Sequence, residues 1–432
     1  MQLDTADTSS TDPVPVDEAT SQGVSAPGLQ PFVFALFFIF GGITSLNDVI
    51  IPKLKDLFTL SYGQALLVQS AFFAAYFIFS IPAAAVVRKA GYLRSAAIGL
   101  LTMTAGCLLF VPASSSGMFG VFLIALFVLA AGITTVQVVA NPLISLLGPP
   151  RTASSRLTFA QAFNSLGTTV FPYVGSILIL GSLTRVDPAT LSGAALDAYR
   201  TAETRTVVHT YLGLAVALVV VAIVVWSQRK RLTDPVDDSG SILKAFELLE
   251  RPRFGIGVLC IFLYVGAEVA IGSLIVSYLM QADALGLGAE AAGKHVPFYW
   301  GGALIGRFIG AYLLRLVSPA KVLAWVATGS IALILISANT TGLVSGWSLL
   351  AIGLMNSIMF PTIFTLASEG LGKRAAEGSG VIAMSIVGGA VIPPLTGMLA
   401  DASGLRFALL LPALCYAVIV GYGLYARRPV RP

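Results

Sequence analysis

The feature that most constrains this chain is a series of apolar runs that recurs from residue 31 almost to the C-terminus. A helix needs about 20 apolar residues to cross the ~30 Å hydrocarbon layer of a bilayer. Twelve runs have about this length, so the sequence predicts an all-α membrane protein with twelve transmembrane helices. The runs cover residues 31–51, 64–87, 95–113, 117–147, 156–180, 205–228, 254–280, 294–316, 320–338, 342–368, 375–400 and 404–426.

Composition and charge support this interpretation. A content of 56% hydrophobic and 11% charged residues is typical of a polytopic membrane protein. When the loops are assigned alternately to the two sides of the membrane, most of the 26 Lys and Arg residues fall on the side of the C-terminus. The positive-inside rule then predicts that both termini are cytoplasmic. The net charge of +5 follows from this topology, so we expect a lipid bilayer and no nucleic acid as partner.

The polar segments divide the chain. Residues 1–30 contain five acidic residues, no Lys or Arg and no apolar core, which predicts a disordered cytoplasmic tail rather than a signal peptide. The longest internal polar break, residues 229–253, separates six apolar runs from six. We therefore expect an N-terminal bundle over 31–228, a cytoplasmic linker, a C-terminal bundle over 254–426 and a short cytoplasmic tail over 427–432.

The two halves repeat each other's spacing. Pro172 and Pro394 each have a glycine five positions before and three positions after. Pro142 and Pro361 each follow an amide residue by five positions. Proline and glycine are common in membrane helices generally, but shared spacing at two places favours a repeat. Two pseudo-symmetric six-helix bundles are the plan of the major facilitator superfamily, in which the bundles rock about a site near the bilayer midplane.

Three charged residues fall inside or near the ends of apolar runs. A mid-helix carboxylate costs about 2.5–3.5 kcal/mol and persists only beside a partner or a wet cavity. Asp48 lies close to Pro52 and is either an interfacial carboxylate or a cavity residue. Glu268 is either half of a static pair with Arg307 or a functional group. Arg307 cannot lose its proton, so we expect a structural ion pair through a direct or water-bridged contact.

Arg307 lies in a glycine-rich segment. Gly302, Gly306 and Gly310 recur every four residues and therefore share one face of the predicted helix. Small residues on one face allow a neighbouring helix to approach closely.

Neutral polar residues gather on the predicted helices. An amide offers both a donor and an acceptor, which suits the hydroxyl groups of a neutral polyol, and aromatic faces can pack on a sugar ring. A single amide can simply tie two helices together, which is worth about 0.6 kcal/mol. Six amides within the apolar runs favour a polar path instead: Asn47, Gln137, Asn141, Gln161, Asn164 and Asn356. The expected substrate-binding residues are Asn47, Gln137, Asn141, Gln161, Asn164, Tyr264, Glu268, Trp300 and Asn356.

Seven segments resemble motifs of the fucose–galactose–proton symporter family of the major facilitator superfamily, and they cover nearly the whole membrane region. The chain is more similar to the glucose, galactose and N-acetylglucosamine importers than to the fucose permeases. The resemblance implies import of a hexose or amino-hexose by cation symport through alternating access. We expect a monomer in the bacterial cytoplasmic membrane. The segments are "SLNDVIIPKLK", "QVVANPLISLLGP", "RLTFAQAFNSLGT", "YVGAEVAIGSLIVSYL", "GRFIGAYLL", "NSIMFPTIFTLA" and "GSGVIAMSIVGGAVIPPLTG".

The resemblance also implies residue roles. Asp48 matches the aspartate that the family protonates, and Asn164 matches a substrate-contacting asparagine. Gln137 falls where the fucose permease has a glutamate, whereas Glu268 supplies a carboxylate absent from that branch. Asp48 and Glu268 are therefore the expected cation-coupling residues. The ion stays open between H⁺ and Na⁺, with Asp48 as a candidate Na⁺ ligand, and no other cofactor is expected.

The chain departs from the superfamily's gating motif. In "AAVVRKAGYLR", Arg88 stands where an aspartate belongs. Gating on the cytoplasmic side then needs other charged pairs, for which the candidates are Glu369, Lys373, Arg374 and Glu377. Because the four residues fall in or next to a predicted loop, we favour solvated loop charges over gating pairs as their interpretation.

Two other classes of protein share parts of this pattern. A drug/proton antiporter shares the twelve-helix plan, but its helix 5 usually carries a Gly-Pro pair, whereas Phe171 precedes Pro172 here. A membrane enzyme needs a nucleophile with a base or a metal cluster. His209 and His295 have no partners at ligand spacing, and the three cysteines stand alone in apolar runs. We therefore expect a transporter and not an enzyme.

Overall fold

The computed structural model describes residues 28–58, 67–116, 118–175, 193–230, 232 and 242–427. For residues 47–53 the backbone is described without the side chains. Apart from residues 28–30 and 427, the predicted tails lie outside the described residues. Part of the predicted linker also lies outside them.

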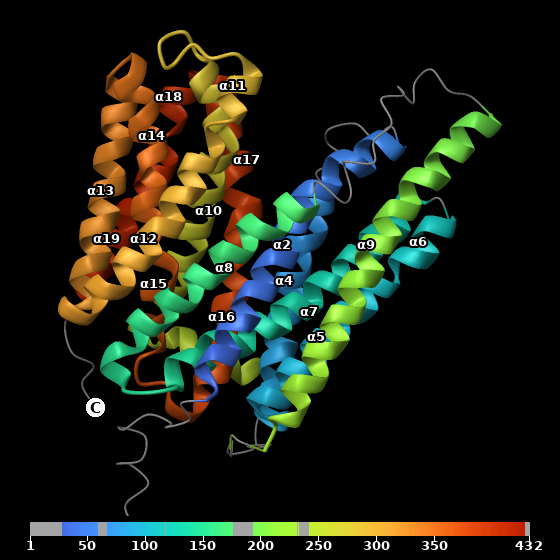
Figure 1. Ribbon diagram of the computed structural model, residues 1–432. Coiled ribbons are helices and arrows are strands. Elements are labelled where there is room, and N and C mark those ends of the chain that lie inside the picture. Colours follow the sequence, from blue (N-terminus) through green and yellow to red (C-terminus); the bar gives the residue numbers. More distant parts are fainter. Residues whose placement is uncertain are drawn as a thin grey trace, which may run out of the picture.

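The N-terminal half forms one bundle of helices (Figure 1). Within it α2 packs against α8, and both α4 and α5 pack against α7. Most of the long helices begin and end near the limits of a predicted run, because polar breaks mark where a helix leaves the apolar layer. The exceptions are α9, which begins well before its predicted run, and α2, which continues past its run. The elements are α2 (Gln30–Phe58), α4 (Leu67–Ala90), α5 (Tyr92–Leu108), α6 (Phe110–Ser116), α7 (Phe119–Leu146), η1 (Pro150–Thr152), α8 (Ala153–Gly175) and α9 (Ala194–Ser227).

The C-terminal half forms a second bundle, in which α10 packs against α17, α19 and α15. Several predicted runs are interrupted here, and the break between α14 and α15 lies inside one run. The elements are η4 (Ile242–Glu250), α10 (Pro252–Met280), α11 (Ala289–Gly293), α12 (Val296–Leu316), α13 (Pro319–Asn339), α14 (Gly342–Asn356), α15 (Met359–Ser368), η5 (Gly372–Arg374), α16 (Ala375–Met384), η6 (Ser385–Val387), α17 (Gly388–Ser403), α18 (Leu405–Ala408) and α19 (Leu410–Tyr425).

Nine helices in the described part of the chain are long and apolar enough to cross a membrane. The predicted runs that do not meet this measure belong to α2, α8 and α12. The apolar part of α2 is counted only over Gln30–Leu46. The other two helices are diluted by polar residues such as Gln161 and Arg307. The count of twelve therefore stays a prediction, and all three helices that fall short carry polar or charged residues of the predicted site.

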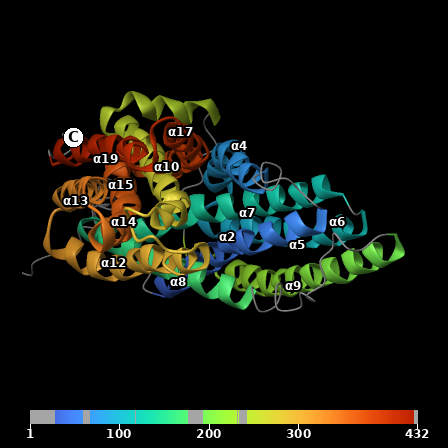
Figure 2. The same ribbon diagram turned by 90° about the horizontal axis from the view of Figure 1, so that it is seen from above.

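The two bundles lie side by side when the molecule is seen from above (Figure 2), and in Figure 1 they meet on the lower side and diverge toward the upper side. Contacts between bundles run from α8 to α12 and α15, and from α16 to α4 and α7. We call the side where the bundles meet, which also holds the last turns of α19, the closed side. The opposite side, where the upper ends of α9 and α13 lie far apart in Figure 1, is the open side.

The glycine face of α12 is confirmed. A Cβ on Gly302 would lie 3.2 Å from the Leu354 nitrogen, and one on Gly306 or Gly310 would collide with Ser357 or Ile358. Glycine therefore lets α12 lie directly against α14 and the start of α15, which brings Arg307 within reach of their backbone.

Candidate functional site

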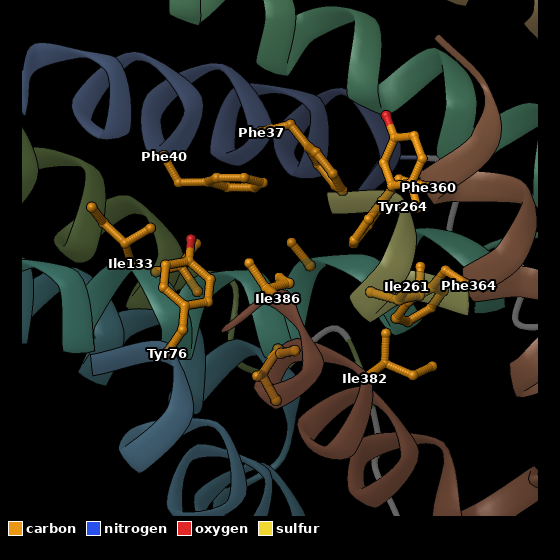
Figure 3. Packing of buried hydrophobic residues seen from close by; sticks show 14 of the residues in the cluster. Phe37, Phe40, Tyr76, Ile133, Ile261, Tyr264, Phe360, Phe364, Ile382 and Ile386 are labelled. Carbon is orange, nitrogen blue, oxygen red and sulfur yellow. The ribbon is translucent and has the colours of Figure 1, made fainter. Parts of the chain in front are cut away.

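A polar cavity of about 170 Å³ lies between the two bundles. This volume is below the ~300 Å³ typical of drug-sized pockets, so the cavity suits a small ligand. Figure 3 shows apolar and aromatic side chains from both bundles around this region, including Phe40, Tyr76, Tyr264, Phe360 and Ile386. The full lining is Phe40, Gly41, Thr44, Tyr76, Gln137, Gln161, Asn164, Thr168, Tyr264, Val265, Glu268, Arg307, Phe360 and Ile386.

The N-terminal wall is built from neutral hydrogen-bonding groups. Tyr76 Oη donates to Gln137 Oε1 over 2.7 Å. This bond uses the amide oxygen of Gln137 as the acceptor, and the Nε2 group of the same side chain takes no part in it. Asn164 donates from Nδ2 to the Phe37 carbonyl at 3.3 Å and still lines the cavity. Gln161, from the same helix α8, completes the amide set.

The C-terminal wall centres on Glu268 of α10. Tyr264, one turn earlier, donates from Oη to Glu268 Oε1 at 2.7 Å. Tyr299 donates to the Glu268 carbonyl at 3.2 Å, and Asn356 Nδ2 donates to Tyr299 Oη at 2.9 Å. The carboxylate is therefore held by a neutral phenol, and its backbone is tied to α12 and α14.

Arg307 lines the cavity and bonds a carbonyl that a proline leaves without a helical partner. Pro361 has no N–H, so the carbonyl of Ser357, four residues earlier, has no intrahelical partner. Arg307 Nε donates to this carbonyl at 3.3 Å, and Arg307 Nη1 donates to the Gln161 carbonyl at 3.4 Å. The guanidinium thus links the break between α14 and α15 to α8 of the other bundle.

Glu268 and Arg307 line the same cavity, yet no ion pair within 4.0 Å joins them in the described part of the chain. The Glu268 carboxylate bonds a phenol, and the Arg307 guanidinium bonds two backbone carbonyls. The direct contact predicted from the sequence is therefore not formed in this conformation. A water-bridged contact stays a prediction.

Three of the other predicted residues, Asn141, Trp300 and Asn356, lie outside the cavity lining. Asn141 and Asn356 are fully buried outside the cavity lining, and each has an amide oxygen without a hydrogen-bond partner in the described structure. Trp300 is 46% exposed and is absent from the lining. Asn47 and Asp48 have described backbone in α2, but their side chains lie outside the description.

The register of α2 still places the Asp48 backbone. Phe40 and Thr44 line the cavity, and Asp48 follows at the next spacing of four on the same face of the helix. Among the described residues, no group of three His, Cys, Asp or Glu side chains could hold a metal ion.

Eight residues of the cavity lining were not predicted from the sequence: Phe40, Gly41, Thr44, Tyr76, Thr168, Val265, Phe360 and Ile386. A lone tyrosine, threonine or phenylalanine in an apolar helix carries no special signal, since all three are common in membrane spans. One signal was available, because Thr44 precedes the predicted Asp48 by one helical turn.

The closed side holds ion pairs at the ends of the helices. Arg88 Nη1 lies 2.8 Å from Glu377 Oε1 and joins α4 to α16, and Arg374 Nε lies 2.8 Å from Glu377 Oε2. Arg253 pairs with Glu369, whose pKa is raised because burial outweighs the nearby guanidinium. Three of the four predicted gating candidates are therefore in ion pairs.

Hydroxyl groups also join the bundles on this side. Ser154 Oγ and Thr365 Oγ1 are 2.6 Å apart, and Ser155 Oγ donates to the Ala311 carbonyl at 2.6 Å. Ser379 Oγ donates to the Val138 carbonyl at 2.9 Å. The interface below the cavity therefore relies on short polar side chains as well as on charges.

Comparisons with known proteins are consistent across sequence and structure. Residues 33–386 match the Major Facilitator Superfamily. A glucose/galactose transporter of Brucella abortus biovar 1 (strain 9-941) is 46% identical over 389 residues, 90% of this chain and 92% of that protein. An L-fucose-proton symporter of Escherichia coli (strain K12) is 35% identical over 408 residues, 92% and 93% of the two chains. The crystal structure of the transporter FucP in the outward conformation has a TM-score of 0.83 at 33% identity, covering 93% and 99%.

Proposed function

Because the chain belongs to the Major Facilitator Superfamily, we propose that it is a cation-coupled symporter that imports a hexose by alternating access. The single observation that carries the proposal is the cavity between the bundles, which combines an amide wall with one described carboxylate. Two similar proteins are named as a glucose/galactose transporter and an L-fucose-proton symporter, which supports a monosaccharide as the substrate.

The cavity chemistry suits a neutral sugar. Gln137, Gln161 and Asn164 present amides, which can both donate to and accept from ring hydroxyls. Phe360 and Tyr264 add aromatic surface on the opposite wall, on which the apolar face of a sugar ring can pack. The roles assigned to these residues are part of the proposal, and so is the choice among glucose, galactose, N-acetylglucosamine and fucose.

Coupling is assigned to carboxylates. Asp48 lies on the cavity face of α2 by register, and Glu268 lines the cavity itself. A carboxylate that binds a cation from one side and releases it to the other links ion movement to sugar movement. The name of the fucose relative favours H⁺ as the ion, with Na⁺ as the alternative in the test below.

The closed side is assigned to the cytoplasm. The positive-inside rule places both termini there, and similarity to a structure in the outward conformation supports the same orientation. The conformation described above then binds sugar from outside, as a monomer in the bacterial inner membrane.

Uptake by purified protein in proteoliposomes tests the function. We expect labelled hexose to accumulate inside the vesicles when the outside is made more acidic than the inside. A Na⁺ gradient alone should not drive accumulation. Accumulation driven by a Na⁺ gradient would show that Na⁺ is the coupling ion, while the protein would still be a hexose symporter. Transport of a labelled cationic dye without any hexose movement would contradict the proposal in favour of a drug antiporter.

Asp48→Asn tests the coupling residue. The amide imitates the shape of the protonated acid but cannot titrate. The variant should lose gradient-driven accumulation and keep exchange of sugar between the two sides. Full concentrative uptake by Asp48→Asn would remove Asp48 from the coupling mechanism.

A further inference from the structure

A polar stripe continues from the cavity into the closed half of the molecule. On α8, Ser154, Thr158 and Gln161 follow at spacings of four and three, so they share one face. On α15, Thr362 and Thr365 are separated by three and share another. The bond between Ser154 and Thr365 shows that these two faces meet across the bundle interface.

Two hydroxyls in this stripe have no partner. Thr158 Oγ1 and Thr362 Oγ1 are fully buried, and neither has a hydrogen-bond partner within the described part of the chain. A Cβ on Gly310 of α12 would lie 3.8 Å from Thr158 Cγ2, which places Thr158 at the interface with the other bundle. A buried hydroxyl without a partner destabilises the conformation that buries it, and valine would fill the same space without that cost.

The two hydroxyls lie between two cavities. Gln161 and Arg307 line the central cavity on one side of them. A second cavity of about 420 Å³ opens on the closed side and is lined by Ala153, Thr365 and Ser368, among others. The bond between Ser154 and Thr365 lies at the boundary of that second cavity, one helical turn from Thr158 and Thr362.

We propose that Thr158 and Thr362 form a release-side sugar subsite, which becomes accessible when the bundles separate on the closed side. The proposal rests on the proposed function, and it assigns hexose hydroxyls as the ligands of this subsite. Each threonine offers one donor and two acceptor positions. In the conformation described here these positions are unused. After opening, they meet the sugar as it leaves Gln161 for the cytoplasm.

The test replaces the hydroxyls by methyl groups of the same shape. The double variant Thr158→Val/Thr362→Val should melt at the same temperature as the wild type or higher, because the conformation seen here loses two unsatisfied groups. Its affinity for hexose on the cytoplasmic face, measured by efflux from proteoliposomes, should fall about fivefold per hydroxyl. Affinity for external hexose should stay unchanged.

Two controls separate this role from general packing. Thr158→Ser/Thr362→Ser keeps both hydroxyls and should retain wild-type efflux affinity. Ser330 is also fully buried with an unpartnered hydroxyl, but it lies on α13, which packs against α14 and α19. Ser330→Ala should therefore leave transport unchanged at both faces.

Two results overturn the subsite. A lower melting temperature in the double valine variant would show that the hydroxyls have structural partners. Unchanged cytoplasmic-face affinity in that variant would show that sugar does not contact them. Failure of the proposed function is distinguishable, because in that case the wild-type protein itself moves no hexose in either direction.

Discussion

The central cavity and the closed-side interface treat charged side chains differently. In the cavity, Glu268 and Arg307 share one lining, but each is hydrogen-bonded to neutral groups. On the closed side, Arg88 and Glu377 form an ion pair at 2.8 Å, and their side chains are only 10% and 12% exposed. One region keeps opposite charges apart, and the other joins them.

The difference indicates two uses of charge. A charge that binds an arriving ligand or ion has to stay available, and neutral partners position it without cancelling it. A charge that holds a conformation is most effective when an opposite charge neutralises it directly.

The largest effect is expected at Glu377, whose carboxylate contacts both Arg88 and Arg374. Glu377→Gln removes the carboxylate that both guanidinium groups share, so the closed side should lose about 3–5 kcal/mol of stabilisation. Arg88→Met should cost less, because Glu377 keeps Arg374. Accessibility labelling of cysteines introduced on the closed side measures the shift. Equal effects of the two changes would contradict the shared-carboxylate geometry.

The next effect concerns Glu268 and Arg307. A buried ion pair would make each single neutralisation cost about 3–5 kcal/mol and the double change much less than the sum. With neutral partners, we expect Glu268→Gln and Arg307→Met each to cost about 1–3 kcal/mol in thermal stability and to add in the double variant. Strong rescue in the double variant would restore the structural ion pair predicted from the sequence.

A smaller effect is expected on the amide wall. Gln137→Ala removes one hydrogen-bonding group from the cavity lining and should weaken hexose binding by about 1–3 kcal/mol. Asn141→Ala is the matched control, since Asn141 is a buried amide of the same helix outside the lining. Binding is measured by calorimetry on protein in detergent. If Asn141→Ala weakens binding as much as Gln137→Ala does, the sugar site is misplaced.

The smallest effect is expected at Glu369, whose side chain is 47% exposed. An exposed pair with Arg253 contributes below about 1 kcal/mol. The folded-state pKa is raised by burial, so the stability from this group is greatest below the unfolded pKa and is lost as pH rises to the folded value. Melting curves from about pH 4 to 7 should show Glu369→Gln gaining stability relative to wild type as pH rises. The opposite slope would mean that Arg253 dominates.

The helices were predictable from the sequence because polar breaks interrupt apolar runs at the length a bilayer requires. The break between α14 and α15 was not predicted, although its cause is visible as Pro361. A proline in a membrane helix either kinks it or is absorbed by neighbouring groups. Which of these occurs depends on whether a donor such as Arg307 lies opposite, and that is a matter of packing between helices.

The sequence predicted the polar character of the site but not which residues line it. Gln137, Gln161 and Asn164 do line one cavity, as their polarity within apolar runs suggests. Asn356 has the same chemistry but is used to hold Tyr299, and sequence alone does not distinguish a lining amide from a supporting one. Trp300 was predicted to bind substrate but is exposed, whereas its neighbour Tyr299 is buried. Consecutive residues of a helix point in different directions, and the sequence does not show which of the two faces inward.

The hydrogen bond from Ser379 to the Val138 carbonyl has a consequence for genetics. Pro142 lacks an N–H, so it leaves the carbonyl four residues earlier, that of Val138, without a helical partner. The acceptor of this bond is main chain, and no side-chain replacement at Val138 removes it. Loss-of-function screens should therefore recover Ser379 and Pro142 as apparently unrelated positions. Both act on one hydrogen bond, because Ser379 is the donor and Pro142 leaves the Val138 carbonyl free to accept it. A residue-by-residue scan would overlook the atom that links them.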